Sequence, residues 1–215
     1  MIVNFSDTNS VFSHYIAEIR DAQIQKDRMR FRRNIERIGE IMAYEISKTF
    51  KYTPIEVTTP LGEANVNVCK DEIVVATIFR AGIPMHHGFL NTLDKANTAF
   101  VSAYRHHINA EEFEIVVEYC ASPNLDNKIL IICDPMLATG NSLTSVYKVL
   151  QEYGKPKQVH LAFALATEQA LQFIQSSIPK STKIWVGAID SELTAQSYIV
   201  PGLGDAGDLC YGEKI

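Results

Sequence analysis

The stretch from Ile129 to Ser142 reads ILIICDPMLATGNS: an apolar run, then an acidic residue, a small polar loop and the start of a helical pattern. It opens an alternation of apolar strands and amphipathic helices that continues to Ile189. The expected strands are Lys128–Cys133, Gln158–Leu165 and Lys183–Ile189, and the expected helices are Ser142–Tyr153 and Glu168–Gln175. This βαβαβ order predicts a mainly parallel, twisted α/β sheet with helices on both faces, which binds ligands at the carboxyl ends of its strands.

The residues upstream and downstream extend this architecture. Ile73–Phe79 is a continuous apolar run that suits a central strand, and Pro84 suits the first turn of a helix that runs toward Leu93. The remaining expectations are strands at Thr98–Tyr104 and Ile115–Tyr119, a hairpin of Ile55–Thr59 and Val66–Cys69 around Gly62, and helical structure from about Ser13 to Phe50. The glycine-rich tail from Asp190 onward is expected to be a loop that closes over the sheet edge.

Length and composition predict one domain over residues 1–215, with an N-terminal helical segment (1–50) and a C-terminal loop segment (190–215). The net charge of −5 argues against extended binding to nucleic acid, which needs a broadly positive face. No stretch approaches the roughly 20 apolar residues of a membrane span. The four cysteines are widely separated and form no CxxC pair, so we expect a soluble protein in the reducing cytoplasm.

The loop that follows the strand at Cys133 has the chemistry of a phosphate site. Amides at a helix N-terminus, together with the positive end of the helix dipole, attract a phosphate, and the hydroxyls of Thr139 and Ser142 add donors. No lysine ends the loop and no GxGxxG is present, so neither a P-loop nor a dinucleotide fold is indicated. On pattern alone, a phosphate cradle and an ordinary βα turn remain equally good interpretations.

The segment DPMLATG at Asp134–Gly140 resembles the phosphoribosyl-pyrophosphate (PRPP) motif of type I phosphoribosyltransferases, in the form typical of the uracil-specific branch. The resemblance implies that Asp134 contacts the ribose hydroxyls and that Ala138–Ser142 hold the 5-phosphate. The implied PRPP-binding loop comprises Asp134, Pro135, Met136, Leu137, Ala138, Thr139, Gly140, Asn141 and Ser142. Asn141 replaces a glycine of the family pattern, which puts the backbone angles of the loop in question.

Two further segments are similar to the family's pyrophosphate-binding elements. IFRAG at Ile78–Gly82 resembles the pyrophosphate loop, which implies PRPP contacts from Arg80, Ala81 and Gly82, and Tyr104-Arg105 resembles the position of a second pyrophosphate arginine. Arginine suits this task because it stays charged and donates in a fork that matches two phosphate oxygens. An isolated arginine at a strand end would otherwise be read as an ordinary surface residue.

YIVPGLGDAGD at Tyr198–Asp208 closely resembles the uracil-binding segment of uracil phosphoribosyltransferases. The resemblance implies that Ile199, Gly204, Asp205 and Ala206 line the base and that Asp205 also contacts PRPP. Uracil presents an acceptor, a donor and an acceptor along one edge, which backbone N–H and C=O groups can complement. Cytosine would oppose donor to donor and leave buried polar groups unpaired at about 1 to 3 kcal/mol each.

Taken together, the resemblance implies a type I phosphoribosyltransferase fold and an enzyme that converts uracil and PRPP to UMP and pyrophosphate in pyrimidine salvage. It implies catalytic roles for Arg80, Arg105, Asp134 and Asp205, and Mg²⁺ bound mainly through the pyrophosphate of PRPP. A protein-bound transition metal is disfavoured, because His86 and His87 on a helix, like His106 and His107 on a strand, would point in different directions. A homodimer or higher homo-oligomer is also implied.

Two alternatives differ in class from this enzyme. A regulator with the same fold that binds RNA would need a basic face, for which the run from Lys26 to Arg37 is the candidate. The same run is otherwise read as a solvated helix face or an effector-phosphate site. A purine phosphoribosyltransferase is disfavoured because Pro135 follows Asp134 where purine enzymes carry a second acid, and because the uracil-like segment is present.

Overall fold

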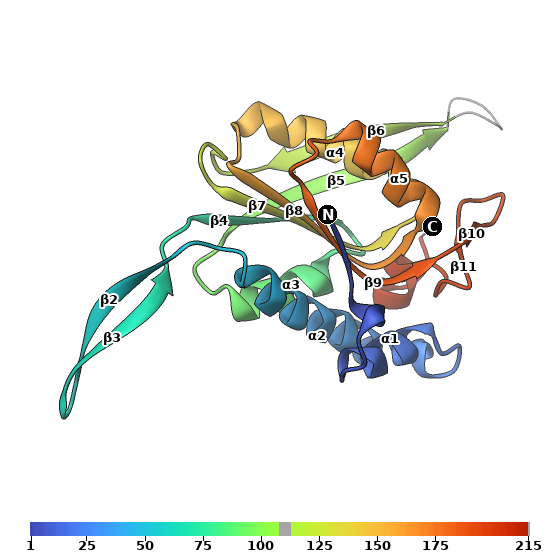
Figure 1. Ribbon diagram of the computed structural model, residues 1–215. Coiled ribbons are helices and arrows are strands. Elements are labelled where there is room, and N and C mark those ends of the chain that lie inside the picture. The colour runs from blue at the N-terminus through green and yellow to red at the C-terminus, as the bar shows by residue number, and fades with distance from the viewer. Residues whose placement is uncertain (108–112, 215) are drawn as a thin grey trace.

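The computed structural model describes residues 1–107 and 113–214, with side chains for 1–103 and 116–214. Within these residues, one seven-stranded sheet has the order β1-β9-β8-β7-β4-β5-β6 (Figure 1). Its strands are β1 (Ile2–Asn4), β4 (Ile73–Phe79), β5 (Asn97–His107), β6 (Phe113–Ala121), β7 (Ile129–Leu137), β8 (Gln158–Thr167) and β9 (Lys183–Asp190). All neighbouring strands are parallel except β5 and β6, so the predicted mainly parallel α/β sheet is confirmed.

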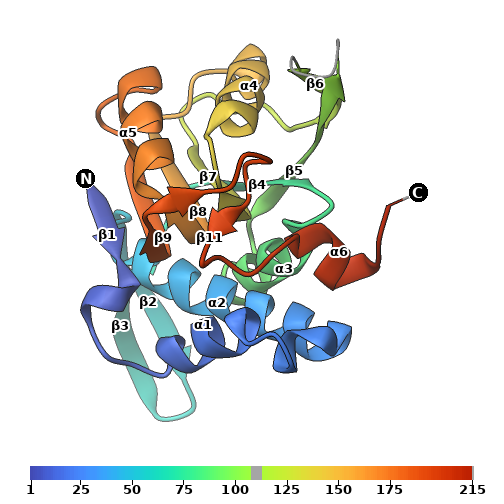
Figure 2. The same cartoon turned by 90° about the vertical axis from the view of Figure 1, so that its right-hand side faces the viewer.

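The sheet is covered on both faces, as the continuous apolar strands predict. Helices α1 (Phe12–Arg20), α2 (Arg28–Ser47) and α3 (Ile83–Thr92) pack on one face, and α4 (Asn141–Leu150) and α5 (Glu168–Ser177) on the other (Figures 1 and 2). A hydrophobic core lies on each face of the sheet, and alternate residues of β4 belong to different cores. Val75 packs toward α1–α3, and Val74 packs toward α4 and α5. The helices expected around Pro84, after Ser142 and after Glu168 are confirmed.

The N-terminal helical segment differs from the expectation of continuous helix over Ser13–Phe50. The chain leaves α1 at Asp21, forms the short 3-10 helix η2 (Ile24–Lys26), and re-enters a helix at α2. Hydrogen bonds between residues close in sequence cause this break. The Asp21 carboxylate accepts from the amides of Gln23 and Ile24. Asp27 then caps α2 by accepting from the Arg30 amide. Both aspartates offer the backbone an alternative to helical hydrogen bonds. Strand β1, which the sequence analysis did not predict, precedes this segment and pairs with β9.

The predicted hairpin is present as β2 (Tyr52–Thr59) and β3 (Gly62–Cys69), paired from Tyr52↔Cys69 to Thr59↔Gly62. It forms a separate two-stranded sheet that projects from the body of the molecule (Figure 1). Its tip residue Leu61 is fully exposed, and Val57 and Val66 are also exposed. The hairpin therefore contributes little to the cores described above.

Two strand and loop boundaries change at the carboxyl edge of the sheet. Strand β7 continues past the predicted end at Cys133 to Leu137, because Asp134, Met136 and Leu137 pair with β8. The helix expected to reach Tyr153 ends as α4 at Leu150 and continues as the 3-10 helix η3 (Gln151–Tyr153). The C-terminal tail is more ordered than the predicted loop: it contains β10 (Glu192–Leu193), β11 (Ile199–Val200) and α6 (Ala206–Tyr211), and it crosses the carboxyl ends of the strands (Figure 2).

Candidate active site

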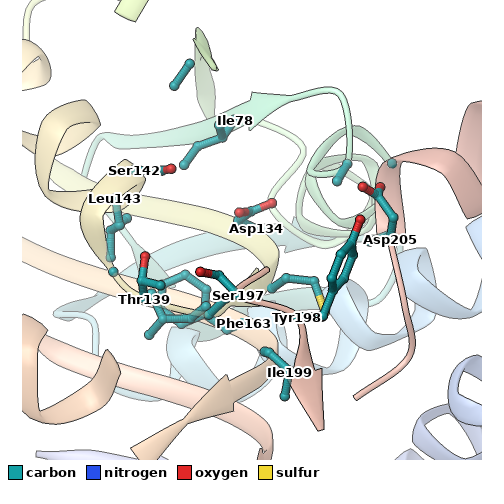
Figure 3. A pocket seen from close by; sticks show the side chains of 18 of the residues that line it. Ile78, Asp134, Thr139, Ser142, Leu143, Phe163, Ser197, Tyr198, Ile199 and Asp205 are labelled. Atoms are coloured by element: carbon teal, nitrogen blue, oxygen red, sulfur yellow. The ribbon is translucent and has the colours of Figure 1, made fainter. Parts of the chain in front are cut away.

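A cavity of about 550 Å³ lies at the carboxyl ends of β4 and β7, where the C-terminal tail crosses the sheet. Figure 3 shows Asp134 near its centre, with Thr139 and Ser142 on one side and Asp205 on the other. The predicted residues that line the cavity are Ala81, Asp134, Met136, Leu137, Ala138, Thr139, Gly140, Ser142, Ile199, Gly204, Asp205 and Ala206. The structure thus brings together segments that are separated by more than a hundred residues of sequence.

The turn before α4 has the geometry that the phosphate prediction requires. Gly140 takes a φ of +85°, which favours glycine, and α4 begins at the next residue, so its first amides lack intrahelical acceptors. Gly140 and Ser142 line the cavity. Thr167 donates its hydroxyl to the Ala138 carbonyl at 2.8 Å, which fixes the turn to the end of β8. Positive φ falls on Gly140 and not on Asn141, so the glycine lost at position 141 does not strain the loop. Asn141 and Pro135 do not line the cavity.

Asp134 enters the cavity from β7, and its environment favours the protonated acid. Burial raises the pKa of the Asp134 carboxyl from its ordinary value to about 8, because the charged form loses hydration. A group with such a pKa can gain or lose a proton when a polar ligand replaces water around it. Across the described residues, no group of three or more His, Cys, Asp or Glu side chains could hold a metal ion.

The residues of the loop after β4 point in different directions. Ala81 lines the cavity, whereas Gly82 packs inward, where an added Cβ would lie 2.2 Å from Thr77 Oγ1. Arg80 does not line the cavity. Its Nη2 pairs with Asp208 Oδ1 at 2.8 Å, and its Nη1 donates to the Gly212 carbonyl at 3.2 Å. The guanidinium thus ties this loop to α6, a connection that the sequence analysis did not predict.

Arg105, the second predicted arginine, lies on β5 opposite Ile115 of β6. Its side chain lies outside the part of the chain whose side chains are described, so its predicted contact with pyrophosphate stays a prediction.

The C-terminal segment presents its backbone to the cavity. Gly204 takes a φ of +94° and lines the cavity beside Asp205 and Ala206. Asp205 also caps α6: its Oδ1 accepts from the amide of Asp208 at 2.9 Å. Because this helix has only six residues, the cap matters for its position. The expected loop over the sheet edge is therefore a capped turn that presents Gly204–Ala206 to the cavity.

Several lining residues were not predicted. Tyr198 and Ser197 come from the turn before β11, Phe163 comes from β8, and Lys214 comes from the C-terminal tail (Figure 3 labels the first three). Tyr198 starts the segment quoted for uracil binding, so its position gave a signal. The sequence held no signal that Phe163 or Lys214 would line the site, because phenylalanine is common in buried strands and lysine is common near chain ends. Among the lining residues of the described chain, Lys214 is the one lysine or arginine.

Two of the described histidines and two arginines of the basic run have structural surroundings. His86 and His160 are buried, and Trp185 Nε1 donates to His160 Nδ1 at 3.0 Å. Arg30 pairs with Glu18, and Arg33 pairs with Glu36 and Glu40. Part of the positive charge of α2 is therefore balanced within the chain.

Comparison with known proteins agrees with this geometry. A relative named uracil phosphoribosyltransferase, from Porphyromonas gingivalis, is 52% identical over 100% of this chain and 99% of its own length. The solved structure of the AQ2163 protein from Aquifex aeolicus superposes with a TM-score of 0.88 at 31% identity and covers 100% of both chains. A hypoxanthine phosphoribosyltransferase from Staphylococcus aureus shares the fold at a TM-score of 0.53 and 15% identity, over 86% of this chain and 84% of its own. Since the uracil phosphoribosyltransferase family also matches residues 6–213, this chain belongs to that family.

Proposed function

We propose that this protein transfers the phosphoribosyl group of PRPP to uracil, giving UMP and pyrophosphate in pyrimidine salvage. One observation carries the proposal: a single cavity is bounded by the Gly140 turn on one side and by Gly204–Ala206 on the other. The first surface suits a sugar phosphate, and the second suits a flat base read through backbone groups. The family of the chain supports the same reaction.

In the proposed complex, the 5-phosphate lies on the turn from Ala138 to Ser142, and the ribose lies over Asp134. Uracil N1 forms a bond to the anomeric carbon of the ribose while the bond from that carbon to pyrophosphate breaks. The departing pyrophosphate takes the bonding electron pair and accepts the N1 proton. Positive charge builds on the ribose in this step. An ionised Asp134 would accept hydrogen bonds from the ribose hydroxyls and stabilise that charge, whereas burial of the carboxyl raises its pKa and favours its protonated form.

The negative charge of pyrophosphate needs cations near the loop after β4. Mg²⁺ bound with PRPP would supply part of the neutralising positive charge, and Asp134 and Asp205 are the lining carboxylates that would help to hold it. Lys214 already faces the cavity. Arg80 reaches the leaving group only if it exchanges Asp208 for a phosphate oxygen. Arg105 is proposed as a further cation at this subsite.

We also propose a homodimer or higher homo-oligomer, with the β2–β3 hairpin in the contact between copies. A two-stranded hairpin is marginally stable by itself, and this one exposes Val57, Leu61 and Val66. A cytoplasmic location fits the four cysteines, all of which are described and free. Among the described residues, no helix combines the length and apolar character that crossing a bilayer requires.

The direct test is incubation of the protein with PRPP and Mg²⁺ and each of uracil, cytosine, hypoxanthine and guanine, with product identified by mass. UMP formed with uracil, and at least about a hundredfold less product with the other bases, is the expected result. Equal rates with purines would reject the proposed base site. A filter-binding titration with RNA at varied salt tests the regulator alternative, for which no binding at physiological salt is expected.

The role of Arg80 is tested by two variants. Arg80→Ala should lower kcat by about a hundredfold with little change in the KM for uracil, because a charge on the leaving group is lost. Asp208→Asn is the matched control: it breaks the same ion pair but keeps the arginine. If Asp208→Asn lowers kcat as strongly as Arg80→Ala, then Arg80 acts as a structural tie and not on pyrophosphate.

A further inference from the structure

A buried ion pair joins the end of α1 to the end of β9, just before the C-terminal tail begins. Arg20 Nη2 lies 2.8 Å from Asp190 Oδ1, and Arg20 Nη1 donates to Asp190 Oδ2 at 2.9 Å. The Asp190 side chain is 6% exposed, so the pair is largely removed from water. Such a pair holds its geometry through a planar, two-bond contact.

The same two side chains also hold the backbone of Gly202, which lies within the segment that resembles the uracil site. Asp190 Oδ2 accepts from the Gly202 amide at 3.0 Å, and Arg20 Nη1 donates to the Gly202 carbonyl at 3.1 Å. Both hydrogen-bonding groups of one residue are therefore fixed by one ion pair. Gly202 has a φ of +54°, and a Cβ there would lie 2.0 Å from the Ile199 carbonyl oxygen, so the turn from Ile199 to Gly202 is tight.

A third side chain from the N-terminal segment holds the next residue. In the amide orientation that satisfies its neighbours, Gln25 donates to the carbonyl oxygens of Leu203 and Ile19, both at 2.9 Å. The turn that holds Ile199 at one end and Gly204 at the other is thus fixed at Gly202 and Leu203. Both end residues line the cavity.

We propose that Arg20 and Asp190, assisted by Gln25, are positioning residues that set the backbone of Ile199–Ala206 for recognition of uracil. The inference rests on the proposed function, and it assigns to the N-terminal helical segment a part in base selection. None of the three lines the cavity, so they act through the turn and not by contact with substrate. Their contacts with the tail are to Gly202 and Leu203 of the segment proposed to bind uracil, and none is with the Gly140 turn, so PRPP binding should depend on them much less.

The experiment uses the full-length chain and compares Arg20→Met and Asp190→Asn with wild type. Both variants should raise the KM for uracil by about five- to tenfold, change the KM for PRPP less than about twofold, and narrow the preference for uracil over cytosine. Arg30→Met is the matched control, since it removes an arginine–carboxylate pair between α2 and α1, with Glu18, that does not touch the tail. It should leave both KM values near those of wild type.

Thermal unfolding of each variant separates positioning from general loss of structure. If Arg20→Met is too unstable to assay, Arg20→Lys decides the question, because it keeps the charge but cannot reproduce the planar fork. Equal increases in both KM values, or a KM for uracil no higher than that of Arg30→Met, would overturn the inference. Failure of the wild-type protein to make UMP would instead reject the proposed function, so the two failures are distinguishable.

Discussion

At the scale of single residues, Asp134 couples stability to pH. Between its ordinary pKa and about 8, the folded protein binds this proton more tightly than the unfolded chain, so the free energy of unfolding falls as pH rises through that window. Asp134→Asn cannot ionise and should remove this loss. At pH 8 we expect the ligand-free variant to be more stable than wild type by about 1 kcal/mol or more, or roughly 2–4 °C.

The measurement is thermal unfolding of ligand-free protein at pH 5 and pH 8. Asp94→Asn is the control, because Asp94 is exposed and does not line the cavity. The gain in the Asp134 variant should be larger at pH 8 than at pH 5 and should come with loss of activity, as is common where a site sacrifices stability for function. A gain that is the same at both pH values would contradict the raised pKa.

Lys214 is the second residue whose effect can be predicted. It faces the cavity while Arg80 is paired with Asp208, so it offers charge to PRPP without breaking another contact. Lys214→Met should raise the KM for PRPP by about tenfold, with less effect on uracil, and the effect should weaken at high salt. Steady-state kinetics at low and high salt measure this. Lys70→Met, at an exposed lysine away from the cavity, should behave as wild type; an unchanged KM in the Lys214 variant would exclude a role at the pyrophosphate subsite.

At the scale of elements, the crossing of α2 and α3 depends on two glycines. A Cβ at Gly39 would lie 2.4 Å from the Met85 carbonyl oxygen, and one at Gly88 would lie 2.0 Å from that of Glu36. Alanine normally stabilises a helix relative to glycine, so the sign of the effect is informative. Gly39→Ala should instead destabilise by about 2 kcal/mol through overpacking, which lowers the Tm by roughly 4–8 °C.

Because α3 starts directly after the loop that carries Arg80 and Ala81, the same variant should also raise the KM for PRPP. Circular dichroism melts and steady-state kinetics on one preparation test both statements. A Tm equal to or above that of wild type would show that the two helices separate at no cost.

At the scale of the whole molecule, the β2–β3 hairpin is the part that the fold leaves uncovered. If copies associate through it, Leu61→Glu with Val66→Glu should convert the assembly to monomers, because the contact would bury charges without partners. Size-exclusion chromatography with light scattering gives the mass of each form. A wild-type monomer, or an assembly that the two substitutions leave intact, would contradict the proposed contact.

The central strands and the crossover helices could be predicted from the order of residues alone. Three segments are mostly apolar on both sides, which predicts strands inside a sheet that is covered on both faces: Ile73–Phe79, Gln158–Leu165 and Lys183–Ile189. The order of these strands and the intervening helices predicts parallel pairing. Local chemistry also determined that a turn at Gly140 opens a helix. The motif resemblance identified most of the residues that line the cavity, because motifs record side chains and backbone turns that are adjacent along the chain.

Which distant groups meet could be learned only from the folded chain. Strand β1 is three residues long and exists because β9 offers it an open edge, and α6 forms where Asp205 caps it and α2 supports it. The partners of Arg80 and Arg20 lie 128 and 170 residues away. The residues next to an arginine in the sequence do not indicate which distant carboxylate it will pair with. Such contacts are set by how the layers pack, which depends on the whole chain at once.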